Sequence, residues 1–268
     1  MNNPVESFYD EHVDYEWNRL ERHRMEFAIT KRALAEFLPP AGSVVDIGGG
    51  PGRYSLWLAG RGYDVTLVDL STANLERARE LFENLQSGRP IRTFVHANAM
   101  DLSALSGKQF DAALLMGPLY HLLAESERRA AVAEALRILK PGGVLLASFI
   151  ARYAPVIDAM VGDPAWLSEH GAELDRFLAT GIETLEEAAP FTSFYAAHPA
   201  EVVPFMEACG AETVALLAQE GLAAGREQGI NKLEGTAWQK WVDLNYRLAS
   251  DASLLAGAEH LLYVGRKR

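Results

Sequence analysis

The chain has 268 residues and a formal net charge of −11, and 49% of its residues are hydrophobic. This composition is typical of a soluble globular protein, and the length allows one large domain or two small ones. The acidic balance argues against a nucleic-acid partner, because affinity for phosphate backbones comes mainly from Lys and Arg. The single cysteine, Cys209, excludes an intramolecular disulfide and predicts a reducing, cytoplasmic location. The first residues lack a signal-peptide pattern and no apolar run is long enough for a membrane span, so we expect no membrane partner.

Residues 11–38 are charged and predict a helix, because their apolar residues recur at helical spacing. Strands and helices then alternate as far as residue 150. Short apolar runs predict strands at 43–47, 64–68, 91–95, 110–116 and 144–150. Such alternation is typical of a parallel sheet with helices on both sides, so we expect an α/β fold.

The alternation stops after residue 150, where aromatic residues become frequent. Residues 199–209 predict a helix, and residues 212–218 and 260–264 predict two further strands. The remaining segments, 151–198 and 221–257, show no clear strand. We interpret them as helical caps on the sheet rather than as a second domain.

A glycine-rich turn, Asp46-Ile47-Gly48-Gly49-Gly50-Pro51-Gly52, follows the first predicted strand. Glycines at this place allow a tight turn, let a ligand approach the backbone and leave helix N–H groups free for an anion. A dinucleotide fingerprint counted from Gly48 requires glycine at position 53, which is Arg53. A nicotinamide-dependent oxidoreductase is therefore a disfavoured alternative.

Asp46, Gly48, Gly50 and Gly52 instead fit the pattern Asp-x-Gly-x-Gly-x-Gly. In this pattern the chain resembles the class I S-adenosylmethionine-dependent methyltransferases, strongly over about residues 40–150 and weakly over 199–220 and 258–268. Further shared motifs are Phe8-Tyr9-Asp10, Glu16-Trp17-Asn18-Arg19-Leu20, Gly117-Pro118-Leu119-Tyr120-His121-Leu122 and Lys140-Pro141-Gly142-Gly143, the first three of them typical of bacterial small-molecule methyltransferases.

The resemblance implies a Rossmann-like doubly wound sheet, mostly parallel with an antiparallel last strand, plus helical cap insertions. Residues 1–268 then form a single methyltransferase domain with an N-terminal helical lid at 1–40 and a cofactor-binding core at 41–150. The caps lie at 151–198 and 221–257, and residues 199–220 and 258–268 complete the sheet.

The resemblance also implies S-adenosylmethionine as the cofactor. Asp69 ends the second strand, where a carboxylate can accept hydrogen bonds from ribose or help to start the next helix. Asn98 stands where the family usually has Asp, and its amide oxygen can accept from adenine. Within the lid, Tyr9 or Tyr15 is expected near the methionine end, with Arg19 as a carboxylate partner. The expected cofactor contacts are Asp46, Gly48, Gly50, Gly52, Asp69, Leu70, Asn98, Ala99, Met100, Met116 and Tyr15.

Methyl transfer is an in-line displacement that needs an oriented, dry site, and a hydroxyl acceptor also needs a base. The segment from Met116 to His121 follows the fourth strand beside the glycine turn. His121 has a suitable pKa for a catalytic base, and the alternative is a packed ring that holds the loop by a hydrogen bond. Gly117-Pro118-Leu119-Tyr120 lacks the Asp/Asn-Pro-Pro motif of methyltransferases that act on nucleic-acid bases.

The aromatic residues of the caps predict an acceptor site for a small apolar or aromatic molecule, although such residues can equally form a small satellite core. The expected acceptor contacts are Tyr120, Tyr153, Trp166, Phe194 and Trp238. The histidines show no spacing typical of a metal site, so we expect no metal. The predicted function is methyl transfer from S-adenosylmethionine to a small molecule. A non-catalytic protein that binds S-adenosylmethionine is the alternative that the glycine turn leaves open.

Overall fold

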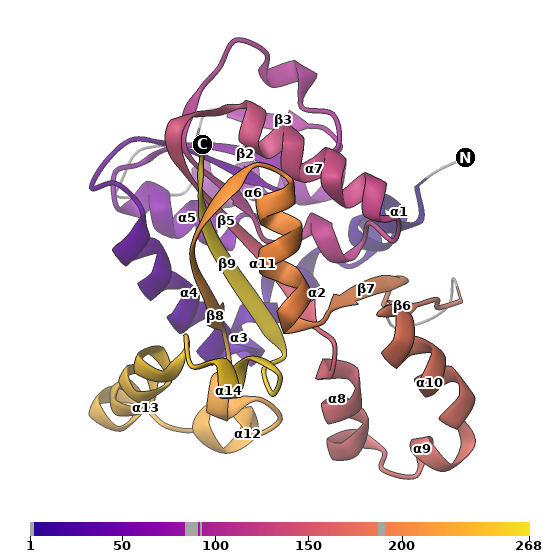
Figure 1. Cartoon of the computed structure of the whole chain (residues 1–268). Helices are drawn as coiled ribbons and strands as arrows, with labels where there is room; N and C mark the ends of the chain where they lie inside the picture. The colour runs from indigo at the N-terminus through magenta and orange to yellow at the C-terminus, as the bar shows by residue number, and fades with distance from the viewer. Residues whose placement is uncertain (1–2, 84–90, 92, 187–190) are drawn as a thin grey trace.

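The structure is a computed structural model that describes residues 3–83, 91, 93–186 and 191–268 (Figure 1). Its sheet contains β1 (Ser43–Ile47), β2 (Asp64–Asp69), β3 (Thr93–His96), β4 (Phe110–Leu115), β5 (Leu139–Ala151), β6 (Ile182–Glu183), β7 (Phe194–Ala197), β8 (Ala211–Ala218) and β9 (His260–Lys267). The predicted strand at 91–95 overlaps β3, and its residue 92 lies outside the described residues.

The helices of the described residues are α1 (Pro4–Glu11), α2 (Val13–Trp17), α3 (Arg19–Arg22), α4 (Arg24–Phe37), α5 (Arg53–Gly60), α6 (Thr72–Glu83), α7 (Glu125–Arg137), α8 (Ala154–Gly162), α9 (Trp166–Glu169), α10 (Gly171–Thr180), α11 (Pro199–Ala208), α12 (Glu227–Ile230), α13 (Gly235–Leu248) and α14 (Ala252–Leu255). Short 3₁₀ turns are η1 (Ser103–Leu105), η2 (Pro118–Tyr120) and η3 (Gly221–Ala223). Among the described residues, no helix combines the length and apolar character of a membrane span.

The strand order confirms the predicted fold class. The path runs β3-β2-β1-β4-β5-β7-β6, and β9 lies antiparallel between β5 and β8. β1 pairs in parallel with β2 on one side and with β4 on the other. The direction of winding therefore reverses between β1 and β4, and in such sheets ligands bind outside the carboxyl ends of the strands at this reversal.

Two layers of helices bury the faces of the sheet. Successive side chains of a strand point to opposite faces, so Val44 packs toward α4, α5 and α6 while Val45 packs toward α7 and α11. Both valines are fully buried. Burial on both faces explains why the central strands read as continuous apolar runs rather than as alternating ones.

The N-terminal region and the first cap differ from their predictions. The single helix expected at 11–38 is divided into α2, α3 and α4, preceded by α1, with breaks at His12, Asn18 and His23. The segment 151–198, expected to contain no strand, contains β6 and β7. β7 continues the sheet because Ala196 pairs in parallel with Ile150, and its short sequence carries no strand pattern of its own. Figure 1 shows α8, α9 and α10 projecting beside this hairpin.

Candidate active site

A cavity of about 550 Å³ lies at the carboxyl ends of β1, β2 and β4, within the usual size range of small-molecule sites. The glycine turn, the loops after β2, β3 and β4, and the N-terminal helices line it. The predicted residues in its lining are Asp46, Gly48, Gly50, Asp69, Leu70, Asn98, Ala99, Met100, Met116, Tyr120 and His121.

Six other predicted residues do not line this cavity. Gly52 begins α5 with a φ of +86°, and Tyr15 is 58% exposed beneath the guanidinium of Arg22. The remaining four belong to the caps: Tyr153 is 36% exposed and contacts His198, Trp166 stacks on His170, Phe194 packs with Phe177, and Trp238 packs beside Met25 and Ile29.

The glycine turn packs directly against the loop after β4. Gly48 has a φ of +67°, and a Cβ added to it would lie 2.5 Å from Cγ of Pro118. A Cβ added to Gly117 would lie 2.7 Å from the carbonyl oxygen of Gly48. Glycine is therefore required on both sides, because only bare backbones let the two loops meet at the cavity.

Two buried carboxylates stand at the ends of β1 and β2. Asp46 accepts a hydrogen bond from Ser55 Oγ at 2.7 Å, and burial, with a smaller contribution from Asp69, raises the pKa of Asp46 to about 6. Asp69 accepts from the N–H of Gly50 at 2.7 Å and from the N–H of Ser71 at 2.9 Å. Burial also raises the pKa of Asp69, partly offset by these hydrogen bonds.

The contacts of Asp69 bear on which cofactor suits the turn. A dinucleotide needs the free N–H groups of such a turn for its pyrophosphate. Here Asp69 already occupies the N–H of Gly50 with a negative charge that would repel a phosphate. This arrangement argues against the nicotinamide alternative. Asp69 also accepts from Ser71 at the start of α6, so its two predicted roles are compatible.

The loop after β3 is shaped by Asn98. Its side-chain oxygen accepts a hydrogen bond from the N–H of Met100 at 2.9 Å, which closes a local turn. Asn98, Ala99 and Met100 all border the cavity as a result.

The N-terminal helices close one side of the cavity through Tyr9, Glu16 and Arg19. Arg19 makes two hydrogen bonds to the carboxylate of Glu26, at 2.7 and 2.8 Å, and its Nε lies 3.4 Å from Glu16. Asp10 accepts a hydrogen bond from Ser71 Oγ at 2.6 Å, which ties α1 to the start of α6. These contacts place the N-terminal segment across the cofactor end of the sheet.

His121 lies in the cavity wall between two hydroxyl groups. Its Nε2 is 2.9 Å from the hydroxyl of Tyr9, and its Nδ1 is 2.8 Å from Oγ1 of Thr192. Burial lowers the pKa of His121 to about 3, so the imidazole is neutral at physiological pH. Both ring nitrogens contact protein hydroxyls, which fits the predicted loop-holding role, and the role of catalytic base stays a prediction.

The lining residues that the sequence analysis did not assign to the site include Glu16, Tyr54 and Asn74. The hydroxyl of Tyr54 and the side-chain oxygen of Asn74 are buried without a hydrogen-bond partner. Unpaired polar atoms in a cavity wall are available to a ligand. Glu16 belongs to the Glu-Trp-Asn-Arg-Leu motif, which was a usable signal, whereas Tyr54 and Asn74 sit in ordinary helical sequence.

Comparisons with known proteins show what the central part of the chain is similar to. Residues 44–143 match the family model of a methyltransferase domain. Over these residues the chain is similar to methyltransferase domains. It is 30% identical over 132 residues to tRNA 5-carboxymethoxyuridine methyltransferase of Escherichia coli K12, covering 48% of each chain. It is 34% identical over 104 residues to glycine/sarcosine N-methyltransferase of Aphanothece halophytica, covering 38% of each. The matched region thus spans about half the length of these relatives or less.

The fold is shared over a greater length than the sequence. The structure of the N-methyltransferase NodS from Bradyrhizobium japonicum WM9, in complex with S-adenosylhomocysteine, superimposes with a TM-score of 0.58 over 99% of both chains at 14% identity. The match to a methyltransferase domain agrees with S-adenosylmethionine as the cofactor, and this neighbour of the same fold was crystallised with S-adenosylhomocysteine.

The residues of the cavity fit this cofactor. S-adenosylmethionine carries a sulfonium, an ammonium and a carboxylate, so its net charge is positive. The cavity presents the carboxylates of Asp46, Asp69 and Glu16, while the charge of Arg19 is largely paired with Glu26. The unpaired oxygen of Asn74 adds an acceptor for a cationic group. An electronegative, glycine-walled cavity therefore suits a cationic cofactor.

Proposed function

We propose that this chain transfers the methyl group of S-adenosylmethionine to a small acceptor molecule that binds beside Tyr120 and His121. The observation that carries this proposal is the continuity of the cavity, which joins the glycine turn to the loop after β4. A single enclosed space for donor and acceptor is what an in-line displacement requires.

When bound, the cofactor supplies a methyl group on a positively charged sulfur, and this charge disperses during transfer. The chain's own residues orient the reactants and exclude water. Asp46 and Asp69 hold negative charge at the donor end, and the bare backbones of Gly48 and Gly117 permit close approach. The N-terminal helices cover the cavity, which favours a reaction that disperses charge.

The residues that line the cavity at the end near His121, called here the acceptor end, support the proposal of a small, apolar or aromatic acceptor. Met116, Tyr120 and Leu122 line this end together with His121. The neutral imidazole of His121 can accept a proton from a hydroxyl acceptor, whereas an amine acceptor needs only orientation. We propose His121 as the catalytic group on this geometry. In this structure the cap residues Tyr153, Trp166, Phe194 and Trp238 stay outside the cavity, so the proposal rests on Tyr120 and its neighbours.

A methylation screen tests the proposal. The full chain is incubated with S-adenosylmethionine and a panel of hydroxyl-, amine- and thiol-bearing small molecules, with bulk transfer RNA as a parallel acceptor. We expect S-adenosylhomocysteine to form with members of the small-molecule panel. Formation with transfer RNA alone would overturn the small-acceptor proposal, and this arm is included because one relative is named for a tRNA substrate.

Binding calorimetry separates the remaining alternatives. Tight binding of S-adenosylmethionine without any S-adenosylhomocysteine formation would favour a non-catalytic binder. Binding of a nicotinamide cofactor without binding of S-adenosylmethionine would overturn the proposal completely. We expect S-adenosylmethionine to bind and the nicotinamide cofactor to fail.

A further inference from the structure

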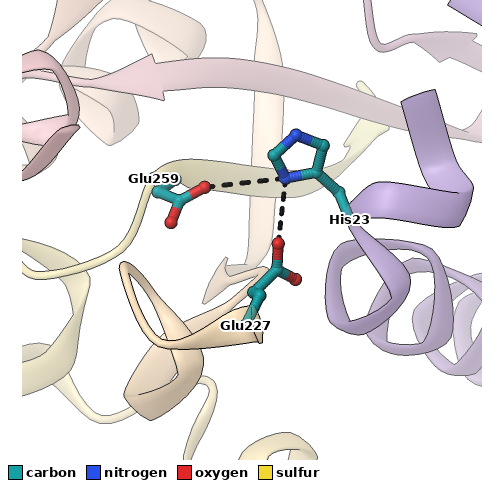
Figure 2. Close-up of side chains that lie close together, drawn as sticks. All are labelled: His23, Glu227 and Glu259. Carbon is teal, nitrogen blue, oxygen red and sulfur yellow. Dashed lines mark ion pairs between the residues drawn. The ribbon is translucent and has the colours of Figure 1, made fainter. Parts of the chain in front are cut away.

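A separate cluster of three side chains joins distant parts of the chain (Figure 2). His23 lies between α3 and α4, Glu227 begins α12, and Glu259 directly precedes β9. Nδ1 of His23 lies 3.0 Å from Oε2 of Glu227 and 3.8 Å from Oε2 of Glu259. One nitrogen and two carboxylate oxygens, all within 4.8 Å of one another, thus converge on one point.

The cluster contains buried polar atoms without hydrogen bonds. Nδ1 of His23 and Oε1 of Glu227 are both buried and lack a hydrogen-bond partner. The His23 nitrogen is close enough to Glu227 for an ion pair, but their geometry is not that of a hydrogen bond. Only 11% of the Glu227 side chain is exposed, so water satisfies little of its carboxylate. A buried carboxylate oxygen without a partner, such as Oε1 of Glu227, is costly, and a bound ligand removes that cost.

The neighbouring cations are already engaged elsewhere. His260 lies 2.8 Å from Glu220 and 4.0 Å from Glu26, and Arg19 pairs with Glu26. His23 lies within ion-pair distance of both Glu227 and Glu259. Two carboxylates thus converge on one imidazole in this half-enclosed place, an arrangement that favours an added cation.

We propose that His23, Glu227 and Glu259 form a binding site for a divalent first-row transition ion such as Zn²⁺ or Mn²⁺. Ligand atoms around a tetrahedral Zn²⁺ are about 3.3–3.6 Å apart when each bond is about 2.0–2.2 Å. The separations of 3.0 and 3.8 Å from the His23 nitrogen lie on either side of this range. An imidazole combined with two carboxylates suits Zn²⁺ or Mn²⁺ better than Mg²⁺, which prefers oxygen ligands alone.

An ion can reach this site from solvent, and its binding would connect two segments of the chain. The side chain of His23 is 32% exposed, which leaves a path from solvent and a place for a water ligand. Bound there, the ion links the N-terminal segment to the second cap, a junction at which Asn231 already donates a hydrogen bond to the carbonyl of Arg22. The same segment carries Glu16 and Arg19 into the cofactor cavity, so the ion would stabilise the cover of that cavity.

The test is ion binding by the full chain, measured by calorimetry with Zn²⁺ and with Mn²⁺ in a Cys209→Ser background. The variants are Glu227→Gln and His23→Gln, and the matched control is Asp243→Asn, which removes an exposed partner of Arg32 on α13. We expect one ion per chain in the parent and the control, and at least tenfold weaker binding in both cluster variants. Zn²⁺ should also raise the thermal unfolding midpoint of the parent and leave that of Glu227→Gln unchanged.

Two outcomes would contradict the proposal of an ion-binding site. Absence of saturable binding of both ions, or an unchanged affinity in Glu227→Gln, would show that the three side chains form ion pairs only. Circular dichroism and S-adenosylmethionine binding verify that each variant is folded. If Glu227→Gln fails this check, Glu259→Gln replaces it and the same comparison decides.

Discussion

The hydroxyl of Tyr9 lies 2.9 Å from Nε2 of His121, although 112 residues separate the two in the chain. This contact joins α1 to the loop after β4 and brings the N-terminal segment to the acceptor end of the cavity. The second ring nitrogen of His121 meets Thr192, so one imidazole connects three separate segments. His121 therefore holds the cover in position, and we propose that it also acts on an acceptor.

Replacing His121 tests these two roles. We expect His121→Ala to lower turnover about 10²–10⁴-fold if the imidazole accepts the proton of the acceptor. Tyr9→Phe is the matched variant, because it removes the hydrogen bond to His121 and keeps both rings, and it should lower turnover by less than about tenfold. Turnover is measured by S-adenosylhomocysteine release, and calorimetry checks that the cofactor still binds. A loss of only a few-fold in His121→Ala would leave His121 with the holding role alone.

The pH dependence of the rate should show no ionisation of His121 near neutrality. Burial lowers the pKa of this histidine to about 3, so the ring stays unprotonated from about pH 5 upward. The ratio of kcat/KM between the parent and His121→Ala should therefore be constant from pH 5 to pH 8. A ratio that falls toward acid with a midpoint near 6.5 would contradict the buried environment.

Asp46 should make the fold less stable as the pH rises from about 4 to about 6. Its pKa is raised to about 6 in the folded chain, so the folded state keeps a proton that the unfolded chain has already released. The stabilisation is fully present below the unfolded pKa and is lost as the pH passes through the folded pKa. The loss is roughly 3 kcal/mol at 1.36 kcal/mol per pKa unit.

Asp46→Asn isolates this contribution. The amide cannot ionise, so the difference in unfolding free energy between the parent and the variant should shift by most of this amount between pH 4 and pH 7. Urea unfolding at several pH values gives the measurement, and the parent should lose stability relative to the variant as the pH rises. A difference that is independent of pH would refute the raised pKa.

Gly48 should be far less tolerant of a side chain than a glycine of similar backbone geometry elsewhere. Gly48→Ala must accommodate a left-handed backbone and a Cβ 2.5 Å from Pro118, whereas Gly62, with a φ of +88°, has no atom within 4 Å of its added Cβ. We expect Gly62→Ala to cost about 1–2 kcal/mol from backbone strain alone. Gly48→Ala should cost more and weaken S-adenosylmethionine binding at least tenfold, as thermal unfolding and calorimetry will show. Equal costs in the two variants would mean that the loops do not pack as described.

The local features of the core were predictable from the sequence. β1, the glycine turn and β2 are specified by short contiguous patterns, because apolar runs predict buried strands and left-handed turns require glycine at Gly48 and Gly50. The cofactor class followed from the same segment together with the family resemblance. The pairing of β7 with β5 did not, since it depends on a contact between Ile150 and Ala196 rather than on a pattern within β7.

The sequence by itself therefore determined the donor half of the site, whose residues follow one another from Asp46 to Gly52 and at the next strand ends. Only the tertiary structure decided the other half. Tyr9 contacts His121 across 112 residues of chain. His23 likewise meets Glu227 and Glu259, which lie far from it in the sequence. Asn74 borders the cavity only because the fold places α6 beside it. The tertiary structure also left the cap aromatics outside the cavity, because side chains pack against the neighbours that the fold supplies, and no periodicity in the sequence encodes those neighbours.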